Sequence, residues 1–179
     1  MILNHPIKTD RVSIERFMAG DFAELYPLFL DKEVLYYYLP GDLTFADKSQ
    51  IKKFLLDWDD GESCFLFSCK REGKLLAILT LEDFSLDQGH TEMGIALVNK
   101  SYYRQGYAKE IVSAMLDCLF KEVGLHKVYI RYIEGNVASK RLFTGLSFKE
   151  EGRFREHVHR ADGYLDVNYM GILDREWLL

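Results

Sequence analysis

No run of apolar residues in this sequence is long enough to cross a membrane. A membrane-spanning helix needs about 18 or more apolar residues in succession, and charged residues make up 28% of this chain. Its first ten residues also lack the basic segment, the apolar segment and the small-residue cleavage site of a secretory signal. We therefore expect a soluble, cytoplasmic protein that makes no membrane contact.

Cysteine is scarce as well. The three cysteines, Cys64, Cys69 and Cys118, are odd in number and show no Cys-x-x-Cys spacing, which argues against a disulfide framework and suits a reducing compartment. We interpret all three as packing residues. His157 and His159 share one strand face, but zinc would need further ligands that the sequence does not offer, so no metal site is expected.

An excess of basic residues is also missing. The net charge is −5 at pH 7, whereas a general nucleic-acid binder needs a basic surface that neutralises phosphates. We expect no nucleic-acid partner. A mildly acidic protein favours cationic substrates, although so small a charge favours them only weakly.

The sequence contains no internal repeat, low-complexity tract or Pro/Gly-rich linker, and only three prolines. Its 179 residues fall within the usual length of one compact domain. A hydrophobic content of 48% is ample for a single core. We predict one domain over residues 1–179.

Hydrophobic periodicity predicts an α+β fold, with a mixed, mostly antiparallel sheet and helices on its faces. Strands are expected at 11–16, 63–70, 74–84, 90–98, 127–133, 148–158 and 164–173. Helices are expected at 21–29, 44–58, 106–123 and 136–144, with Asp21 and Asn136 as N-caps and Gly124 as a terminator. The predicted order is β-α-α-β-β-β-α-β-α-β-β.

Strand directions follow from the connections. Arg71-Glu72-Gly73 and Asp162-Gly163 are typical of hairpin turns between antiparallel strands. The fourth strand (90–98), the helix after it and the fifth strand form a βαβ unit, so these two strands should be parallel with a right-handed crossover. Gly94, inside the fourth strand, marks a bulge or a close approach of backbone.

The helix at 106–123 is the most regular in the sequence, and the loop before it ends in Gly106-Tyr107-Ala108. A helix N-terminus presents unpaired N–H groups and positive partial charge, which bind phosphate oxygens. Gly106 would let a pyrophosphate approach the backbone, and Ala108 leaves the first turn uncluttered. Neither Gly-x-Gly-x-x-Gly nor Gly-Lys-Ser/Thr is present. Taken alone, Gly-x-Ala favours the simpler interpretation of a helix start.

In this context Tyr103-Arg104-Gln105-Gly106-Tyr107-Ala108 resembles the Gln/Arg-x-x-Gly-x-Gly/Ala fingerprint of the GNAT superfamily of acetyl-CoA-dependent N-acetyltransferases, except at its first position. An aromatic residue there is common in the Rim-type branch, which includes ribosomal-protein N-terminal acetyltransferases. Further resemblance to that branch covers roughly the C-terminal half of the chain, at Thr91–Gly94, Gly124–Val128, Glu134–Ser139, Glu151–Glu156 and Tyr164–Val167. The N-terminal half matches only in the order of its elements.

The resemblance implies a GNAT fold in which acetyl-CoA, with no metal, lies between splayed fourth and fifth strands. Backbone groups around Leu97 and Val98 would pair with the pantetheine arm. The pyrophosphate would be held by Arg104, Gln105, Gly106, Tyr107, Ala108 and Lys109. Asn136 matches the family asparagine that contacts the pantetheine, and is equally well explained as a plain N-cap.

Acetyl transfer to an amine needs a neutral nucleophile, a stabilised oxyanion and a proton for the departing thiolate. In many family members a tyrosine supplies that proton, but the matching residue here is Phe143, which we interpret as core or as a wall for the acetyl group. Ser139 matches a serine assigned the acid role in the Rim-type branch; the alternative is a helix-capping hydroxyl. Glu92 is the first candidate for the base, and its alternative is a cross-strand charge partner.

Tyr38 and Glu156 are weaker candidates for substrate binding. Tyr38 belongs to a tyrosine run on the predicted loop between the first helices, where aromatic packing explains it almost as well. Glu156 lies on a strand that borders the expected acceptor site, where a solvated strand face is the default. Asp166 is a family match that we interpret as structural.

The resemblance implies an amine acceptor, either a small molecule or a protein N-terminus, which attacks acetyl-CoA directly in a ternary complex. Dimers are common in the family, so the resemblance also allows a homodimer, although the sequence itself does not determine the oligomeric state. Phe143 motivates a second hypothesis, a non-catalytic regulator that binds acyl-CoA.

Overall fold

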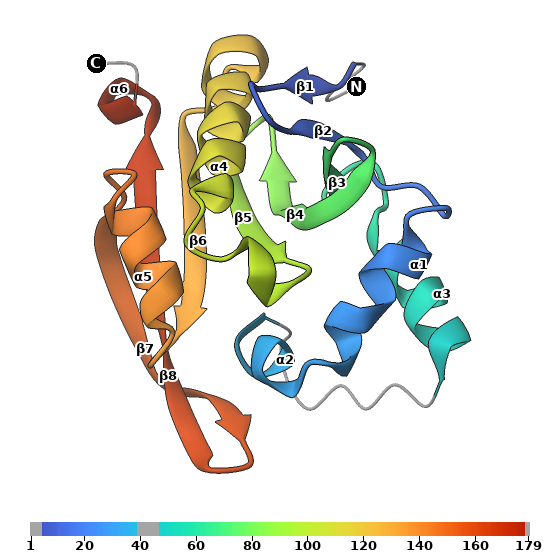
Figure 1. Ribbon diagram of the computed structural model, residues 1–179. Helices are drawn as coiled ribbons and strands as arrows, with labels where there is room; N and C mark the ends of the chain where they lie inside the picture. The colour runs from blue at the N-terminus through green and yellow to red at the C-terminus, as the bar shows by residue number, and fades with distance from the viewer. Residues whose placement is uncertain (1–4, 39–46, 178–179) are drawn as a thin grey trace.

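The structure, a computed structural model, describes residues 5–38 and 47–177, without the side chain of Tyr38. The strands of these residues form one mixed sheet in the order β1-β2-β3-β4-β5-β6-β8-β7 (Figure 1). Their bounds are β1 Ile7–Lys8, β2 Ser13–Arg16, β3 Phe65–Arg71, β4 Lys74–Ser85, β5 His90–Leu97, β6 Lys127–Ile133, β7 Lys149–Arg160 and β8 Gly163–Leu173.

The pair β5–β6 is parallel, and the other pairings of the described strands are antiparallel. The connection from β5 to β6 runs through a long helix, as a parallel pair requires. The predicted α+β fold with parallel fourth and fifth strands is therefore confirmed.

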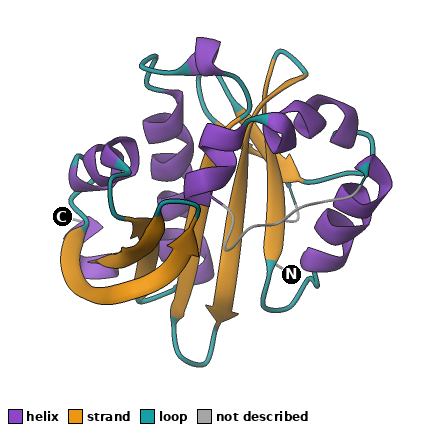
Figure 2. Cartoon of the chain, turned by 90° about the horizontal axis from the view of Figure 1, so that it is seen from below, coloured by secondary structure: helices purple, strands orange, loops and turns teal. Residues whose placement is uncertain are grey.

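Helices lie on both sides of the sheet (Figure 2). Their bounds are α1 Phe22–Leu25, the 3-10 segment η1 Tyr26–Leu30, α2 Lys32–Tyr38, α3 Lys48–Trp58, the 3-10 segment η2 Lys100–Tyr102, α4 Tyr107–Asp117, the π-helical η3 Cys118–Val123, α5 Val137–Thr144 and α6 Asp174–Trp177. None of these helices combines the length and apolarity that a membrane-spanning segment requires.

Two hydrophobic clusters fill the two sides. The larger lies under α4 and includes Leu79, Met93 and Val112, and the smaller joins α1, η1 and α3 to Ile78 and Ala96. Since successive side chains of a strand point to opposite faces, Ile78 and Leu79 belong to different clusters. Burial on both faces explains why the first part of β4 is a continuous apolar run rather than an alternating one.

Several helix boundaries differ from the predicted ones. The helix expected at 44–58 begins at Lys48, because Asp47 caps it by accepting hydrogen bonds from the N–H groups of Ser49 and Gln50; positions 44–46 lie outside the described residues. The predicted helix 106–123 is α-helical only as far as Asp117 and continues as η3. Gly124, with φ +80, ends it as expected.

Residues 21–29 form the short α1 followed by η1 instead of one helix. Asp21 occupies the N-cap position, but its side chain hydrogen-bonds Ser68 on β3 and pairs with Lys70 instead of capping the helix. Gly94 pairs regularly with Thr80, so the expected bulge is not there; the irregularity lies between Glu82 and Ser85. The elements β1, α2 and α6 were not predicted.

Candidate active site

The parallel strands β5 and β6 are hydrogen-bonded over only part of their length. Their register covers His90↔Lys127 to Glu92↔Tyr129 and stops there, although β5 continues to Leu97 and β6 to Ile133. We call the region beyond these pairs the β5–β6 opening. It faces α2, which contacts both strands (Figure 1).

In this opening, backbone polar groups of β5 have no strand partner among the residues that the structure describes. The N–H of Val98 donates to Leu76 on β4 at 3.0 Å, and alternate residues of an antiparallel strand direct their N–H and C=O groups to the same neighbour. The backbone groups of Ile95 and Leu97 therefore point the other way, into the β5–β6 opening. Val98, which the resemblance placed beside the pantetheine arm, therefore directs its N–H to β4 instead. Ile95, which was not predicted, directs its backbone groups into the opening.

The loop at the end of β5 leads into α4. Gly106 is the N-cap residue, with φ +81 in the left-handed region that favours glycine. Its carbonyl accepts from the N–H of Glu110 at 3.0 Å. Within the described parts of the chain, the N–H groups of Gly106, Tyr107, Ala108 and Lys109 donate to no acceptor. Free N–H groups at a helix N-terminus form an anion site.

Arg11, in the turn between β1 and β2, supports this loop. Its Nη1 donates to the carbonyl of Gln105 at 3.1 Å, and its Nε donates to Glu110 at 2.7 Å. Its guanidinium carbon lies 4.4 Å from the centroid of the Tyr107 ring. Thr9 also donates to Glu110, at 2.6 Å. No local sequence signal points to Arg11, because these partners are about a hundred residues distant along the chain.

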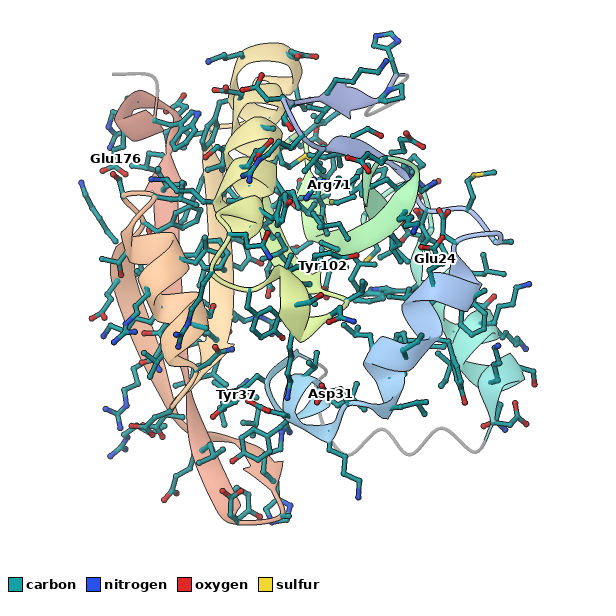
Figure 3. All side chains as sticks on the ribbon, viewed as in Figure 1. Glu24, Asp31, Tyr37, Arg71, Tyr102 and Glu176 are labelled. Carbon is teal, nitrogen blue, oxygen red and sulfur yellow. The ribbon has the colours of Figure 1, made fainter. Side chains whose placement is uncertain are left out.

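The predicted loop residues contribute in different ways. Tyr107 is 2% exposed, and its hydroxyl hydrogen-bonds the guanidinium of Arg71, which Figure 3 labels. The side chain of Tyr107 is therefore part of the core, and only its backbone N–H is left to contact a ligand. The side chains of Arg104 and Lys109 are exposed, and that of Gln105 donates to the carbonyl of Ser101.

The start of α5 carries Asn136, Ser139 and Phe143. The Asn136 side chain accepts a hydrogen bond from the N–H of Ser139 at 3.0 Å, so the N-cap interpretation is confirmed. The Ser139 hydroxyl is half-buried and has no hydrogen-bond partner among the described residues. Phe143 is 3% exposed and packs edge-on against Phe148 in the larger cluster, which supports the core interpretation of its ring.

Glu92 lies where β5 and β6 begin to separate. It accepts from Nε of Arg131 on β6 at 2.7 Å, so it is the cross-strand charge partner that the sequence left as the alternative to a base. Burial raises the pKa of Glu92, and the charge of Arg131 opposes this only in part. Burial disfavours the charged form of Arg131. The hydrogen bond to Glu92 and the attraction of its charge outweigh burial, so the pKa of Arg131 is raised.

A second carboxylate, Glu82, lies directly across from Glu92 on β4. Burial, and then repulsion by Glu92, raise the pKa of Glu82 to about 6, against a smaller lowering by Arg131. Glu82 could not be identified from the sequence, because it follows an apolar run and its pairing with Glu92 depends on strand register.

Beside these carboxylates lies a further polar network. Tyr129 donates to Asp83 at 2.7 Å, and a ring nitrogen of His90 lies 3.1 Å from the same carboxylate. The ring of Tyr129 stacks on that of Tyr169 from β8, with centroids 6.5 Å apart. The surface next to the separating strands is therefore rich in carboxylates and aromatic rings.

The tyrosine run forms the end of α2 instead of the predicted loop. The side chain of Tyr38 lies outside the described residues. Tyr36 donates to Asp162 in the β7–β8 turn at 2.9 Å. The hydroxyl of Tyr37, which Figure 3 labels, lies close to Gly135 in the loop after β6: a Cβ added to Gly135 would be 3.4 Å from it.

Glu156 lies on a β-bulge of β7, with φ +52. Its N–H donates to Asp166 at 2.6 Å, and this bond is the main reason that the pKa of Asp166 is lowered. Asp166 also pairs with Arg153. The side chain of Asp166 thus holds the bulge in place, whereas that of Glu156 is exposed.

The three cysteines are unpaired; Cys69 and Cys118 are buried and Cys64 is partly buried. In the described chain, no three His, Cys, Asp or Glu side chains come together as a metal site would require.

Comparisons with known proteins all point to acetyltransferases. A family model described as an acetyltransferase (GNAT) domain matches residues 11–149. The uncharacterized N-acetyltransferase YnaD of Bacillus subtilis is 27% identical over 172 residues, which cover 96% of this chain and 98% of YnaD. The spermidine N(1)-acetyltransferase of Vibrio cholerae is 21% identical over 168 residues, covering 94% of this chain and 96% of that enzyme. A crystal structure of spermidine N-acetyltransferase from Vibrio cholerae with CoA and spermine superposes with a TM-score of 0.84 at 19% identity, over 96% of this chain and all of that one.

Proposed function

This chain belongs to the GNAT acetyltransferase family and is an acetyl-CoA-dependent N-acetyltransferase, and from that premise we propose that it acetylates a primary amine by direct attack on the thioester in a ternary complex. Acetyl-CoA, when bound, supplies an acetyl group activated by its sulfur. One observation carries the proposal: backbone groups of β5 in the β5–β6 opening, and the N–H groups at the start of α4 that follows β5 along the chain, have no partner among the described residues.

The binding roles divide between these two sets of backbone groups. Ile95 and Leu97 would pair with the amides of the pantetheine arm, in place of the missing strand partner. The N–H groups of residues 106–109 would hold the pyrophosphate, because a helix N-terminus favours anions. Asn136 would add its side-chain N–H₂, which its capping bond leaves free. Ser139, whose hydroxyl has no partner among the described residues, would donate a proton toward the sulfur.

The acceptor side lies on the other face of the sheet from α4. The carboxylates of Glu82, Asp83 and Glu92 gather there, and such a charge favours an acceptor that is cationic before it reacts. The Rim-type resemblance favours a protein N-terminus, and the similarity to a spermidine acetyltransferase favours a small polyamine. Both are primary amines that are protonated in solution, so both belong to the proposal.

Thiol release tests the proposal. The full chain is incubated with acetyl-CoA and, separately, with spermidine, free amino acids and short peptides with free N-termini; peptides with blocked N-termini and no side-chain amine serve as matched controls. We expect thiol release with at least one free amine and none with its blocked counterpart. Tight acetyl-CoA binding without thiol release for any amine would instead support the non-catalytic regulator.

A further inference from the structure

Glu82 and Glu92 form a cross-strand pair on the acceptor face of the sheet. Their neighbours Leu81 and Met93 lie in the cluster under α4, and side chains alternate between faces along a strand. Both carboxylates therefore point away from α4. Glu92 borders the β5–β6 opening directly, and Glu82 lies one strand further away, at a spacing of about 4.8 Å.

The two carboxylates differ in their partners. Glu92 is bound to Arg131 at 2.7 Å, and this ion pair joins β5 to β6 next to their last backbone pair. Its side chain is 12% exposed. To accept a proton, Glu92 would have to weaken its attraction to Arg131 in a mostly desolvated setting, where a lost partner is costly.

Glu82 has no such restraint. Its carboxylate makes no hydrogen bond or ion pair with a described residue. No fully buried side-chain oxygen or nitrogen of the described chain lacks a partner, so the oxygens of Glu82 reach solvent. The titratable and charged groups that face it are Glu92 from β5, Arg131 from β6 and Cys64 from the segment before β3.

We propose that Glu82 is the proton acceptor of acetyl transfer, and that the Glu92–Arg131 pair is a positioning unit beside it. This inference rests on the proposed function. In the reaction, the amine nitrogen forms a bond to the acetyl carbonyl carbon, and the carbon–sulfur bond breaks with its electron pair on sulfur. The proton that the nitrogen loses passes through one water molecule to a Glu82 oxygen, and the thiolate takes a proton from Ser139 or from solvent.

The acidity of Glu82 suits this task. A general base works best when its pKa lies close to the working pH, and the pKa of Glu82 is raised to about 6. It is therefore mostly ionised at neutral pH and still basic enough to accept a proton. Pairs of carboxylates whose environments differ commonly divide catalytic roles in this way.

The test compares Glu82→Gln with Glu92→Gln in the full chain, using the amine found by thiol release. The acceptor amine contributes one deprotonation of its own to kcat/KM. In the wild type we expect the slope of log kcat/KM against pH to rise from about 1 to about 2 below pH 6, because Glu82 must also be ionised. Glu82→Gln should keep a slope of about 1 and lower kcat about 100-fold, with unchanged acetyl-CoA affinity.

Glu92→Gln gives the matched control. It removes the repulsion that raises the pKa of Glu82 and leaves the attraction of Arg131. The part of the pH profile with a slope of about 2, which we call the steep limb, should therefore remain and move to lower pH. Glu82→Asp, which keeps a titratable carboxylate, should retain the steep limb at a reduced rate. This second variant keeps the test decisive if Glu82→Gln does not fold, which circular dichroism and acetyl-CoA binding would reveal.

A Glu82→Gln or Glu82→Asp enzyme with the wild-type rate and pH profile overturns the inference. Loss of the steep limb in Glu92→Gln also overturns it and makes Glu92 the base. Absence of turnover in the wild type overturns the proposed function, and this inference with it, whereas wild-type turnover with unaffected Glu82 variants overturns this inference alone.

Discussion

Substitution of Gly106 tests whether the start of α4 binds the pyrophosphate. Gly106 has φ +81, and a non-glycine residue in the left-handed region costs about 1–2 kcal/mol. An added Cβ would meet only Nη2 of Arg11, at 3.6 Å, which is an ordinary contact. Gly106→Ala should therefore lower the free energy of unfolding by about 1–2 kcal/mol without a steric clash. The free energy of unfolding of Gly106→Glu should fall by no more than that of Gly106→Ala, because the new carboxylate would lie within reach of the Arg11 guanidinium.

Cofactor affinity should separate the two variants. A carboxylate roughly 5 Å from a phosphate charge, at an effective dielectric constant of about 20, is repelled by about 3 kcal/mol. Since about 1.4 kcal/mol is a tenfold change in affinity, Gly106→Glu should bind CoA at least about 100-fold more weakly than Gly106→Ala.

Isothermal titration calorimetry with CoA measures this difference, and thermal unfolding of both variants gives the matched stability control. CoA affinity unchanged from wild type in both the Glu and the Ala variants would refute the placement of the pyrophosphate at this helix. Equal loss of affinity in both, relative to wild type, would show that backbone strain and not charge is responsible, which would refute the electrostatic reasoning.

Arg11→Ala removes a charged hydrogen bond to the Gln105 carbonyl, so we expect CoA affinity to fall about 5- to 30-fold, with kcat unchanged at saturating acetyl-CoA; unchanged affinity would contradict a supporting role. Glu82→Gln should be more stable than wild type by at most about 2 kcal/mol above pH 6, because folding raises the pKa of Glu82 from 4.5 to about 6 and stability is lost as pH rises through that range. Urea titrations should show the difference vanish below pH 4.5, and a pH-independent difference would contradict it. Asn136→Ala should cost about 1 kcal/mol of stability, measured by urea unfolding, because the helix cap is lost. A weaker affinity for CoA at a temperature where the variant is fully folded would support the pantetheine role of Asn136, and unchanged affinity would contradict it.

Much of the site was predictable because its signals are local. Gly106 stands before an amphipathic helix, and both the N-cap role of Asn136 and the parallel direction of strands 90–98 and 127–133 follow from short stretches of sequence. The alternation of a strand would also have shown that Ile95 and Leu97, and not Val98, share one side. That inference needed only one further fact, the register of β5 on β4.

Other features depend on distant partners. Arg11 lies 94 positions from the Gln105 carbonyl that it binds, and Arg131 lies 39 positions from Glu92. No propensity or spacing links such residues, because side chains meet through sheet order and register. For the same reason the tyrosine run was placed on a loop, whereas packing against Asp162 and Gly135 accompanies its helical form in α2.

The sequence by itself determined the family, the mixed sheet with its parallel pair, and the glycine at which the amphipathic helix α4 begins, because hydrophobic period, turn residues and helix caps are local physical constraints. The tertiary structure decided which groups are free to act. It showed that β5 and β6 separate after Glu92, that Arg131 forms an ion pair with the Glu92 carboxylate, and that Glu82 has no hydrogen-bond or ion-pair partner among the residues that the structure describes. These facts depend on burial and on electrostatic pairing between strands, which exist only once the chain has folded.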